Sequence, residues 1–340
     1  MSSETAASEI TPLRSRSGTV CVNNNNYTSD TSNCDRVQIN ISGDVEDARE
    51  MDDNRKIFIK VGIDILILMC VGFPILFFYL WGDPYKRGFY CDDESLRHPF
   101  KESTVRNWML YIVGLALPIF VMIITEIVRA NIHKTSTRHR YRLFSFDVPS
   151  WAVEAYKQIG VFGFGAACSQ LTTDIAKYSI GRLRPHFYSV CEPIMKDGSN
   201  CSNPINFGKY IEDFQCIGTN SSPRMLKEMR LSFPSGHSSF SAYTMVYCAI
   251  YLHARMKWRG SKLAKHFLQF FLVMLAWYTA LSRVSDYKHH WSDVLSGSLL
   301  GTVCAVTVAN CVADLFNTKA QSVLPLARLD SSVQATNGRP

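Results

Sequence analysis

The sequence predicts an all-α integral membrane protein with six transmembrane helices, whose core helical bundle carries a candidate site at the extracytoplasmic face. Three observations predict this class. A polar segment covers residues 1–54, six long apolar runs follow it, and the most basic connections fall between alternate runs. Each feature has its own physical basis.

The polar segment is rich in Ser, Thr, Asn and Asp and contains few large apolar side chains. Such a composition cannot bury enough apolar surface to offset the conformational entropy lost on folding. We therefore expect a disordered, cytoplasmic N-terminal tail over residues 1–54. The first apolar run begins too deep in the chain for a cleavable signal peptide.

The apolar runs approach the roughly 20 residues that cross a bilayer as a helix. They cover residues 57–81, 108–129, 157–178, 237–254, 267–282 and 293–316. The fourth and fifth are short and flanked by charges, so buried core helices of a soluble protein are the alternative interpretation. Six spans give a membrane domain over residues 55–316 and a cytoplasmic C-terminal tail over residues 317–340.

Two basic connections set the expected orientation. Residues 131–154 carry Lys134, Arg138, Arg140 and Arg142, and residues 255–265 carry five cations and no acid. Because cytoplasmic loops are enriched in Lys and Arg, both connections should face the cytoplasm. The loops after the first, third and fifth spans then face outward. The net charge of +7 is spread over the loops and requires no nucleic-acid partner.

Cysteines and glycosylation sequons fit this orientation. Four cysteines fall in the predicted outer loops: Cys91, Cys191, Cys201 and Cys216. Disulfides persist in that compartment, although the sequence does not give their pairing. Asn200 and Asn220 begin sequons in the loop after the third run, so both are expected glycosylation sites.

The first candidate cluster closes the third run, with the sequence KYSIGRLRP. Lys177 and Arg184 are seven residues apart, about two helical turns, so both cations can face one site. Pro185 restricts Arg184 to extended geometry, so the helix should end there and free the guanidinium to bind phosphate oxygens. The alternative is that these basic residues form a collar that meets lipid headgroups, and we keep that interpretation for Arg182.

The second cluster, SFPSGH over residues 232–237, precedes the fourth run. Ser followed by Pro is typical of the cap and first turn of a helix, and Gly236 lets a ligand approach the backbone closely. The free N–H groups of a helix N-terminus, here near Ser235, bind anions. His237 could protonate a leaving oxygen, or it could be an ordinary loop residue.

The third cluster, SRVSDYKHHWSD, lies between the fifth and sixth runs. His289 and Asp293 are four residues apart, which places them on one face of a helical turn. If the carboxylate accepts the Nδ1 proton, Nε2 stays unprotonated, as a nucleophile requires. His290 could make the same contact. A purely structural His–Asp pair or a metal site are alternatives, but neither explains the cations around Lys177.

All three clusters fall on the same predicted side of the membrane. Phosphoryl transfer mainly requires positioning and stabilisation of charge on the equatorial oxygens. The cations Lys177, Arg184 and Arg283, with the region of Ser235 and Gly236, can provide both without a metal ion. No repeated Cys-x-x-Cys spacing is present, so we expect no metal and no cofactor.

These clusters resemble the motifs of the type 2 phosphatidic acid phosphatase superfamily: Lys-x6-Arg-Pro, Pro-Ser-Gly-His and Ser-Arg-x5-His-x3-Asp. All three are complete in this sequence. The residues around them, and the segment GFYCDDES over residues 88–95, are similar to the lipid phosphate phosphatase branch and its wunen-like members. The resemblance covers residues 55–316 and leaves out both tails.

The resemblance implies a role for each motif position. His289 would attack phosphorus to form a phosphohistidine, Asp293 would orient it, and His237 would protonate the leaving alkoxide and then activate water. His289 is preferred over His290 because the family spacing counts from the motif arginine. The phosphate-binding residues that the resemblance implies are Lys177, Arg184, Ser235, Gly236 and Arg283.

The resemblance also implies a reaction and partners. We expect metal-independent hydrolysis of phosphatidic acid, lysophosphatidic acid, ceramide phosphate or sphingosine phosphate, with the headgroup in an outward pocket and the tails in lipid. Lipid phosphates and membrane lipids are the expected partners. Relatives in this branch are described as dimers, so a homodimer is expected. The plasma membrane is the expected location by default, because no retention signal is readable at residues 338–340.

Three other functions fit parts of the sequence. A phosphatase for a soluble sugar phosphate or an isoprenoid diphosphate would share the motifs, because they specify only the phosphate. A catalytically idle membrane protein that binds lipid or partners would be marked by loss of a catalytic histidine, and both are present. A transporter is suggested only by charged residues near or within the runs: Lys60, Asp64, Glu126 and Asp174.

Overall fold

The computed structural model describes residues 41–132, 141–143, 146–219, 221–256 and 262–316. The chain divides into two compact units, residues 1–58 and 59–340, and helix α1 (Ile41–Trp81) runs from the first into the second. The helix thus begins before residue 54, where the disordered tail was expected to end. Ala, Glu, Arg and Met in this stretch are good helix formers. Residues 1–40 and 317–340 of the expected tails lie outside the described residues.

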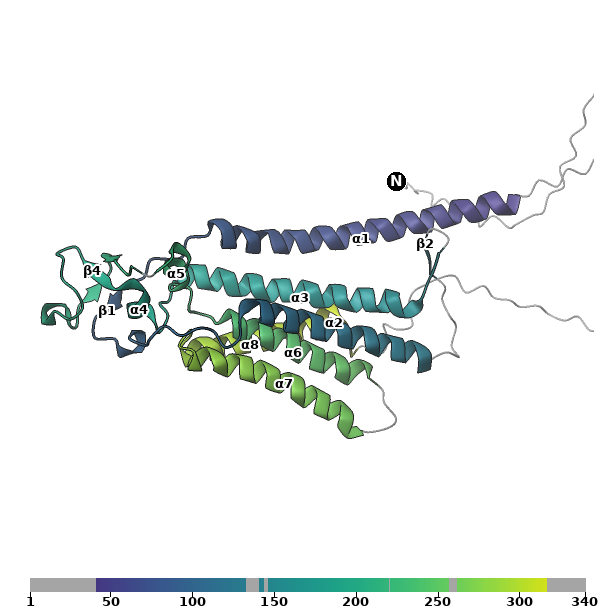
Figure 1. Ribbon diagram of the computed structural model, residues 1–340. Helices are drawn as coiled ribbons and strands as arrows, with labels where there is room; N and C mark the ends of the chain where they lie inside the picture. Colours follow the sequence, from purple (N-terminus) through teal and green to yellow (C-terminus); the bar gives the residue numbers. More distant parts are fainter. Residues whose placement is uncertain (1–40, 133–140, 144–145, 220, 257–261, 317–340) are drawn as a thin grey trace, which may run out of the picture. The chain divides into compact units, whose positions relative to one another are not determined.

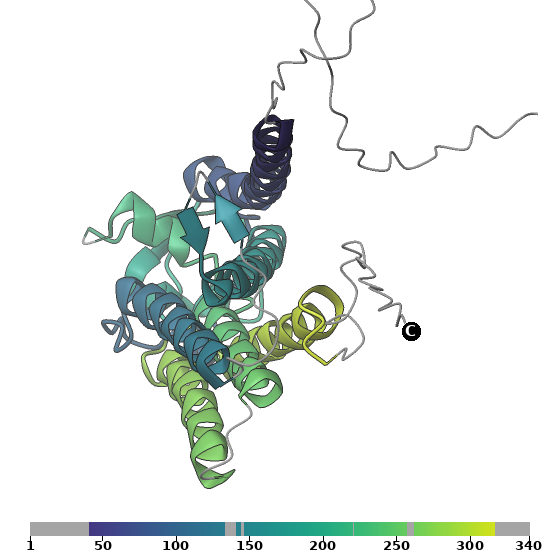
Figure 2. The ribbon, with the colours of Figure 1, turned by 90° about the vertical axis from the view of Figure 1, so that its right-hand side faces the viewer.

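Each of the six apolar runs forms a long helix. After α1 come α2 (Asn107–Ile132), α3 (Ser150–Ile180), α6 (Gly236–Arg255), α7 (Lys262–Ser285) and α8 (Trp291–Thr307), and a π-helical turn, η3 (Val308–Val312), continues α8. Within the second unit α2, α3, α6, α7 and α8 run alongside one another (Figure 1). The end-on view in Figure 2 shows α6 among the others, and it packs against α2, α3, α7 and α8.

Among the described residues, four helices are long and apolar enough to cross a membrane: Ile57–Trp81, Asn107–Ile132, Leu263–Ser285 and Trp291–Val312. Helices α3 and α6 are not among them. The reason for α6 is its central position, because side chains that face other helices rather than lipid need not be apolar. Its polar residues are buried: Ser238, Ser239, Ser241, Tyr243 and Thr244.

Helix α6 carries a row of tyrosines into the core. Tyr243, Tyr247 and Tyr251 are fully buried and recur every four residues, so they lie along one helix face. The Tyr243 hydroxyl donates a 2.9 Å hydrogen bond to the carbonyl of Phe162 in α3. Tyr243 therefore ties α6 to α3 through a buried polar contact as well as apolar ones.

Close packing of α8 on α6 sets the geometry of the site. A Cβ atom at Gly297 or Gly301 would collide with the backbone of Ser235 or Ser239 in the facing segment. Small residues of this kind let two helices approach closely. The approach also allows the Ser235 N–H to donate a 3.0 Å hydrogen bond to the carbonyl of Asp293. The second and third clusters are thereby fixed to each other.

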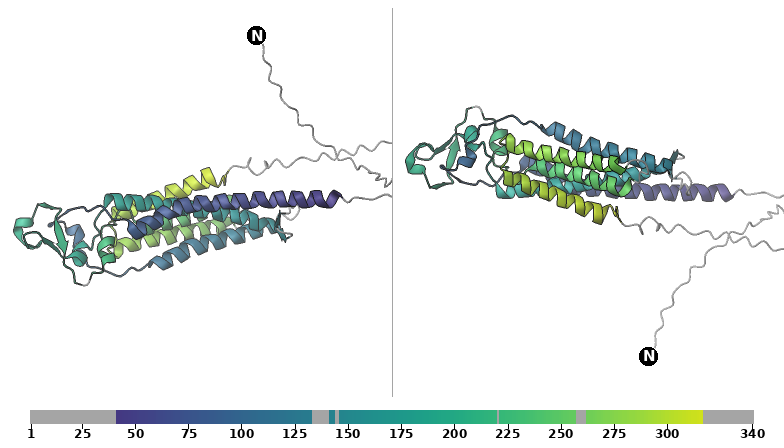
Figure 3. Two further views of the ribbon diagram at one scale, coloured as in Figure 1. Left: turned by 90° about the horizontal axis from the view of Figure 1, so that it is seen from above. Right: turned by 90° about the horizontal axis from the view of Figure 1, so that it is seen from below.

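Short elements gather at one end of the long helices (Figures 1 and 3). They include the helices α4 (Phe187–Cys191) and α5 (Pro223–Glu228), the 3-10 turns η1 (Glu94–Leu96) and η2 (Pro204–Asn206), and two strand pairs, β1 (Phe89–Tyr90) with β5 (Tyr210–Ile211) and β4 (Pro193–Met195) with β6 (Phe214–Cys216). We call this region the cap. A further strand pair, β2 (Tyr141–Leu143) with β3 (Phe146–Val148), lies between α2 and α3. The all-α prediction missed all three strand pairs.

The cap has its own core and covalent cross-links. The ring of Phe89 packs against those of Phe187 and Phe214, at 4.9 and 5.0 Å between centroids. Disulfides join Cys91 to Cys201 and Cys191 to Cys216, which settles the pairing that the sequence left open. Each disulfide links segments distant in the chain, so the cap is held together despite its short elements.

Two of the four charged residues that suggested a transporter are engaged in structural contacts. Glu126 is buried, accepts a 2.6 Å hydrogen bond from the Tyr251 hydroxyl and pairs with Arg129 at 2.9 Å. Asp64 accepts a 3.2 Å hydrogen bond from the Tyr156 hydroxyl. These partners explain the two acids without an ion pathway.

Candidate active site

The three sequence clusters meet where the long helices join the cap. Helix α3 ends at Ile180, because Gly181 adopts a left-handed conformation (φ 60°) and its N–H donates to the carbonyl of Lys177. The sequence predicted a helix that continued to Arg184. The earlier stop leaves Arg182 and Arg184 in the loop between α3 and α4.

The imidazole of His289 is held by a backbone oxygen. Its Nδ1 atom lies 2.7 Å from the carbonyl of Ser232, and the side chain is buried. Because a carbonyl can only accept, Nδ1 carries the proton and Nε2 keeps its lone pair. Burial holds the pKa of His289 well below its ordinary value, and the nearby cations Arg184 and Lys177 lower it further. His289 is therefore neutral near pH 7, with a free Nε2.

Asp293 does not make the predicted hydrogen bond to His289. Its Oδ2 lies 4.0 Å from the His289 Nδ1 and instead accepts a 2.6 Å hydrogen bond from the Ser232 hydroxyl. The spacing argument required both residues to lie in one helix, but α8 begins at Trp291 and His289 precedes it. The carboxylate thus reaches His289 through Ser232, which supplies both the hydroxyl and the carbonyl. Ser232 was not predicted as a site residue.

The imidazole that contacts Asp293 directly belongs to His290. Its Nδ1 lies 3.2 Å from the carboxylate, and its backbone N–H donates to the same oxygen at 3.1 Å, as in a helix capping box. His289 lines the cavity described below, whereas His290 is not among its lining residues. The structure therefore distinguishes the two histidines, which their sequence spacing from Asp293 did not, because only His289 lines the cavity.

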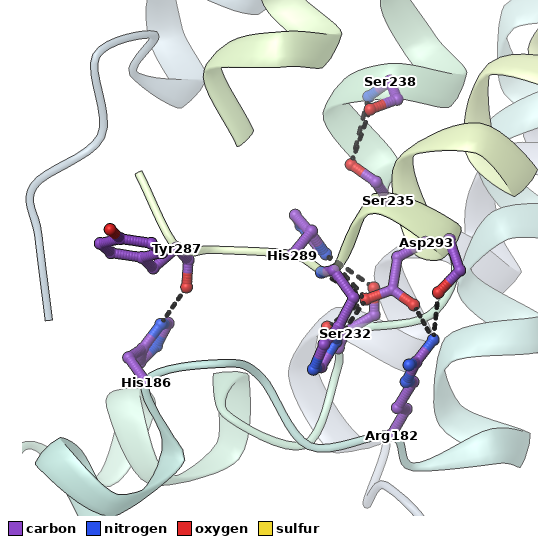
Figure 4. Close-up of polar contacts among 10 residues, drawn as sticks. Arg182, His186, Ser232, Ser235, Ser238, Tyr287, His289 and Asp293 are labelled. Carbon is purple, nitrogen blue, oxygen red and sulfur yellow. Dashed lines mark hydrogen bonds and ion pairs between the residues drawn. The ribbon is translucent and has the colours of Figure 1, made fainter. Parts of the chain in front are cut away.

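Arg182 also has a specific partner, so its assignment to a headgroup collar was wrong. Its guanidinium contacts the carboxylate of Asp293 and donates a 2.9 Å hydrogen bond to the hydroxyl of Ser292 (Figure 4). The side chain of Asp293 is itself fully buried. A buried carboxylate needs compensation of this kind. Arg182 therefore has a structural role at Asp293.

Helix α6 presents its N-terminus to the site. Ser235 is the N-cap and accepts hydrogen bonds from the N–H and hydroxyl of Ser238, at 3.4 and 2.9 Å. A Cβ atom at Gly236 would lie 2.7 Å from the Lys177 ammonium, so this glycine makes room for the cation beside the helix N-terminus. A helix N-terminus and an ammonium that converge form a strong anion site.

His237 occupies the first turn of α6 and lines the same cavity. Its Nε2 atom is buried and has no hydrogen-bond partner within the described part of the chain. A buried polar atom without a partner is unusual and is often satisfied by a ligand. His237 is therefore placed to exchange a proton with a bound molecule.

Three cations surround this position. The ammonium of Lys177 lies 3.8 Å from Asp174, the guanidinium of Arg283 pairs with Asp286 at 3.0 Å, and the buried Nε of Arg184 lacks a partner in the described residues. Arg283 is only 1% exposed. Three cations that converge with only two acidic partners between them favour an anionic ligand.

The cavity that these groups line is amphiphilic. Its volume is about 1290 Å³, and its polar wall contains Lys177, Arg184, Gly236, His237, Arg283 and His289. Its apolar wall includes Ile75, Leu76 and Tyr79 from α1 and Trp108, Leu110 and Tyr111 from α2. Both of those helices are long and apolar enough to cross a membrane. Ser235 and Asp293 do not line the cavity. They contact the residues that form it, because Ser235 caps α6 and Asp293 accepts a hydrogen bond from Ser232.

The described residues contain no group of three or more His, Cys, Asp or Glu side chains arranged to hold a metal ion. The predicted glycosylation site Asn200 is exposed on the cap, and its Oδ1 accepts a 3.1 Å hydrogen bond from the backbone of Ser202. Asn220 lies outside the described residues.

Long apolar helices around a histidine-containing anion site define a multi-pass membrane protein. The chain belongs to the PAP2 superfamily, whose model matches residues 158–317. It is 61% identical over 295 residues to a Drosophila melanogaster protein named "Putative phosphatidate phosphatase", which covers 85% of this chain and 77% of that one.

Two mammalian relatives are also similar to the chain. Phospholipid phosphatase 1 of Rattus norvegicus is 44% identical over 260 residues, covering 76% of this chain and 86% of the relative. Phospholipid phosphatase 2 of Homo sapiens is 39% identical over 264 residues, covering 77% and 85%. No solved structure matches the chain.

Proposed function

We propose that the chain is a metal-independent lipid phosphate phosphatase, which hydrolyses phosphatidic acid, lysophosphatidic acid, ceramide phosphate or sphingosine phosphate. The observation that carries this proposal is the amphiphilic cavity, which joins an anion site to an apolar wall from two membrane-type helices. A soluble sugar phosphate would leave that apolar wall without a partner. The names of the relatives support the same substrate class.

The first step forms a bond between the Nε2 lone pair of His289 and phosphorus. The bond between phosphorus and the lipid oxygen breaks, and His237 gives its proton to that oxygen. Lys177, Arg184 and Arg283 stabilise the charge on the phosphoryl oxygens, together with the backbone N–H groups at Gly236. In the second step a water oxygen bonds to phosphorus, the bond between phosphorus and the Nε2 of His289 breaks, and His237 takes up the proton of that water, so that inorganic phosphate leaves.

The membrane topology is part of the same proposal. All six long helices span the bilayer, with α6 packed against α2, α3, α7 and α8. The cap and the cavity face outward from the plasma membrane, both tails are cytoplasmic, and residues 55–316 form the catalytic domain. Disulfides within the cap support the outward orientation. A homodimer, expected from the resemblance, can be tested by the mass of the detergent-solubilised protein.

Phosphate release from phosphatidic acid in detergent micelles, with excess chelator, tests the function. The intact protein should release phosphate, and His289→Ala should abolish release. His290→Ala is the matched control, because it removes an adjacent imidazole that does not line the cavity, and it should retain most activity. No release from the folded intact protein with any of the four lipids would contradict the proposal and favour an idle lipid-binding protein.

A further inference from the structure

Lys288, which directly precedes His289, is a buried lysine at a position of the third motif where the residue type is unspecified. It is 6% exposed, and its ammonium lies 3.5 Å from the centre of the Phe100 ring. Both Lys288 and Phe100 line the cavity that contains His289. A cation thus lies within the site without a role in the mechanism described above.

Lys288 has no ion pair among the described residues. The nearby carboxylate of Asp286 is already occupied, because it pairs with Arg283 at 3.0 Å and accepts two 2.8 Å hydrogen bonds from Thr104. Burial lowers the pKa of Lys288 to about 8, and the charges of Arg184 and Arg283 act in the same direction, while Asp286 and Glu228 oppose them. A buried ammonium beside two guanidinium groups is costly unless an anion joins them.

Resting on the proposed function, we propose that Lys288 is a further phosphate-binding residue, whose ammonium moves from the ring of Phe100 onto the oxygens of a bound phosphomonoester dianion. The four-carbon stem of a lysine permits such a movement. The exchange is favourable because a hydrogen bond between oppositely charged groups is generally stronger than a cation–π contact.

Phe100 has partners other than Lys288. The Phe100 N–H donates a 3.3 Å hydrogen bond to the Ser189 hydroxyl, and the ring packs edge-on against His186 at 5.2 Å. Neither contact involves Lys288. Lys101 offers a matched comparison, because its ammonium also lies over an aromatic ring, that of Tyr287 at 4.5 Å, yet it does not line the cavity.

Equilibrium binding of orthovanadate to the detergent-solubilised protein tests this inference without requiring turnover. Lys288→Met should weaken binding about 10- to 100-fold, the equivalent of one charge-assisted hydrogen bond. Lys101→Met should bind within about 2-fold of the intact protein, since a cation outside the cavity feels only screened attraction. Phe100→Leu should bind at least as tightly as the intact protein, because it removes the ring that competes for the ammonium.

Binding by Lys288→Met that equals the intact protein would overturn the inference. So would a loss in Phe100→Leu as large as that in Lys288→Met, because Lys288 would then only pack the cavity wall. Two further variants serve should Lys288→Met fail to fold: Lys288→Arg, which keeps the charge, and Lys288→Gln, which removes it. The orthovanadate affinity of Lys288→Arg must then lie nearer to that of the intact protein than to that of Lys288→Gln.

The same assay separates this inference from the proposed function. If the intact protein binds orthovanadate but hydrolyses no lipid phosphate, the proposed function is wrong, while the comparison of Lys288→Met with Lys101→Met still decides the role of Lys288. An intact protein that binds no orthovanadate would overturn both.

Discussion

The Nδ1 atom of His289 lies 2.7 Å from the carbonyl oxygen of Ser232, whereas it lies 4.0 Å from the Oδ2 atom of Asp293. A backbone carbonyl fixes the tautomer that leaves Nε2 free, and no side-chain substitution removes it. The hydroxyl of the same serine donates to Asp293 at 2.6 Å. Asp293 is therefore a positioning residue that acts through Ser232.

Asp293→Asn tests this indirect role. The amide is a weaker acceptor for the Ser232 hydroxyl and leaves Arg182 without its ion pair, but the carbonyl that holds His289 remains. Activity should fall about 10- to 100-fold, as is typical of residues that orient another group. Phosphate release should be compared with that of His289→Ala. A loss as complete as in His289→Ala would show that Asp293 contacts the nucleophile directly during catalysis.

Gly236→Ala should disturb the phosphate site without unfolding the protein. The added methyl would lie 2.7 Å from the Lys177 ammonium, which must move away from the helix N-terminus. Losing one charge-assisted contact should raise KM about 10-fold or more. Gly160→Ala in α3 is the control, because nothing lies within 4 Å of its added methyl. Equal KM values for the two variants would contradict this account of Gly236.

His186 should make the protein less stable in acid. Burial lowers its pKa to about 4, below the usual value of 6.5, although its ring donates a 2.8 Å hydrogen bond to the carbonyl of Tyr287. Between these two values the unfolded chain binds more protons than the folded one, so stability falls as pH drops below 6.5. The cost by pH 4.5 is about 2 kcal/mol.

His186→Asn keeps a donor near the Nδ1 position but cannot take up a proton. Apparent melting temperatures of the two proteins should be measured from pH 7.5 to 4.5. The intact protein should lose more thermal stability than the variant over this range. Parallel curves would show that His186 does not titrate as its burial implies.

The two disulfides should contribute unequally to cap stability. The Cys91–Cys201 link closes a separation of 110 residues and Cys191–Cys216 one of 25. In the chain-entropy description, the longer loop gives the larger stabilisation, by about 1 kcal/mol. Paired Cys→Ser variants, compared by denaturation in detergent, should rank accordingly. The melting temperature of the intact protein should also fall once a reductant has opened both disulfides. An unchanged melting temperature would contradict a stabilising role.

The sequence predicted the long helices well, because each apolar run is a local signal. The run at residues 237–254 corresponds to Gly236–Arg255, and that at residues 108–129 to Asn107–Ile132. The cap could not be predicted in this way. Its strands are two or three residues long, and the contact of Phe89 with Phe214 joins residues far apart in the chain.

The candidate site shows the same division between local and distant information. The motifs identified His237, His289 and Arg184, which all line the cavity. The role of the Ser232 carbonyl could not be predicted, because every residue has a backbone carbonyl. Only the folded chain shows which carbonyl accepts the hydrogen bond from His289. Arg182 was misassigned because its partner, Asp293, is 111 residues away.

Trapping of the covalent intermediate tests the central claim most directly. Intact protein mixed with a radiolabelled lipid phosphate and quenched at millisecond times should carry label that is stable in alkali and labile in acid, as expected of phosphohistidine. The label should map to the peptide that contains His289 and be absent from His289→Ala but present in His290→Ala. Turnover without any trapped label, or equal labelling of His289→Ala, would contradict the assignment of His289 as the nucleophile.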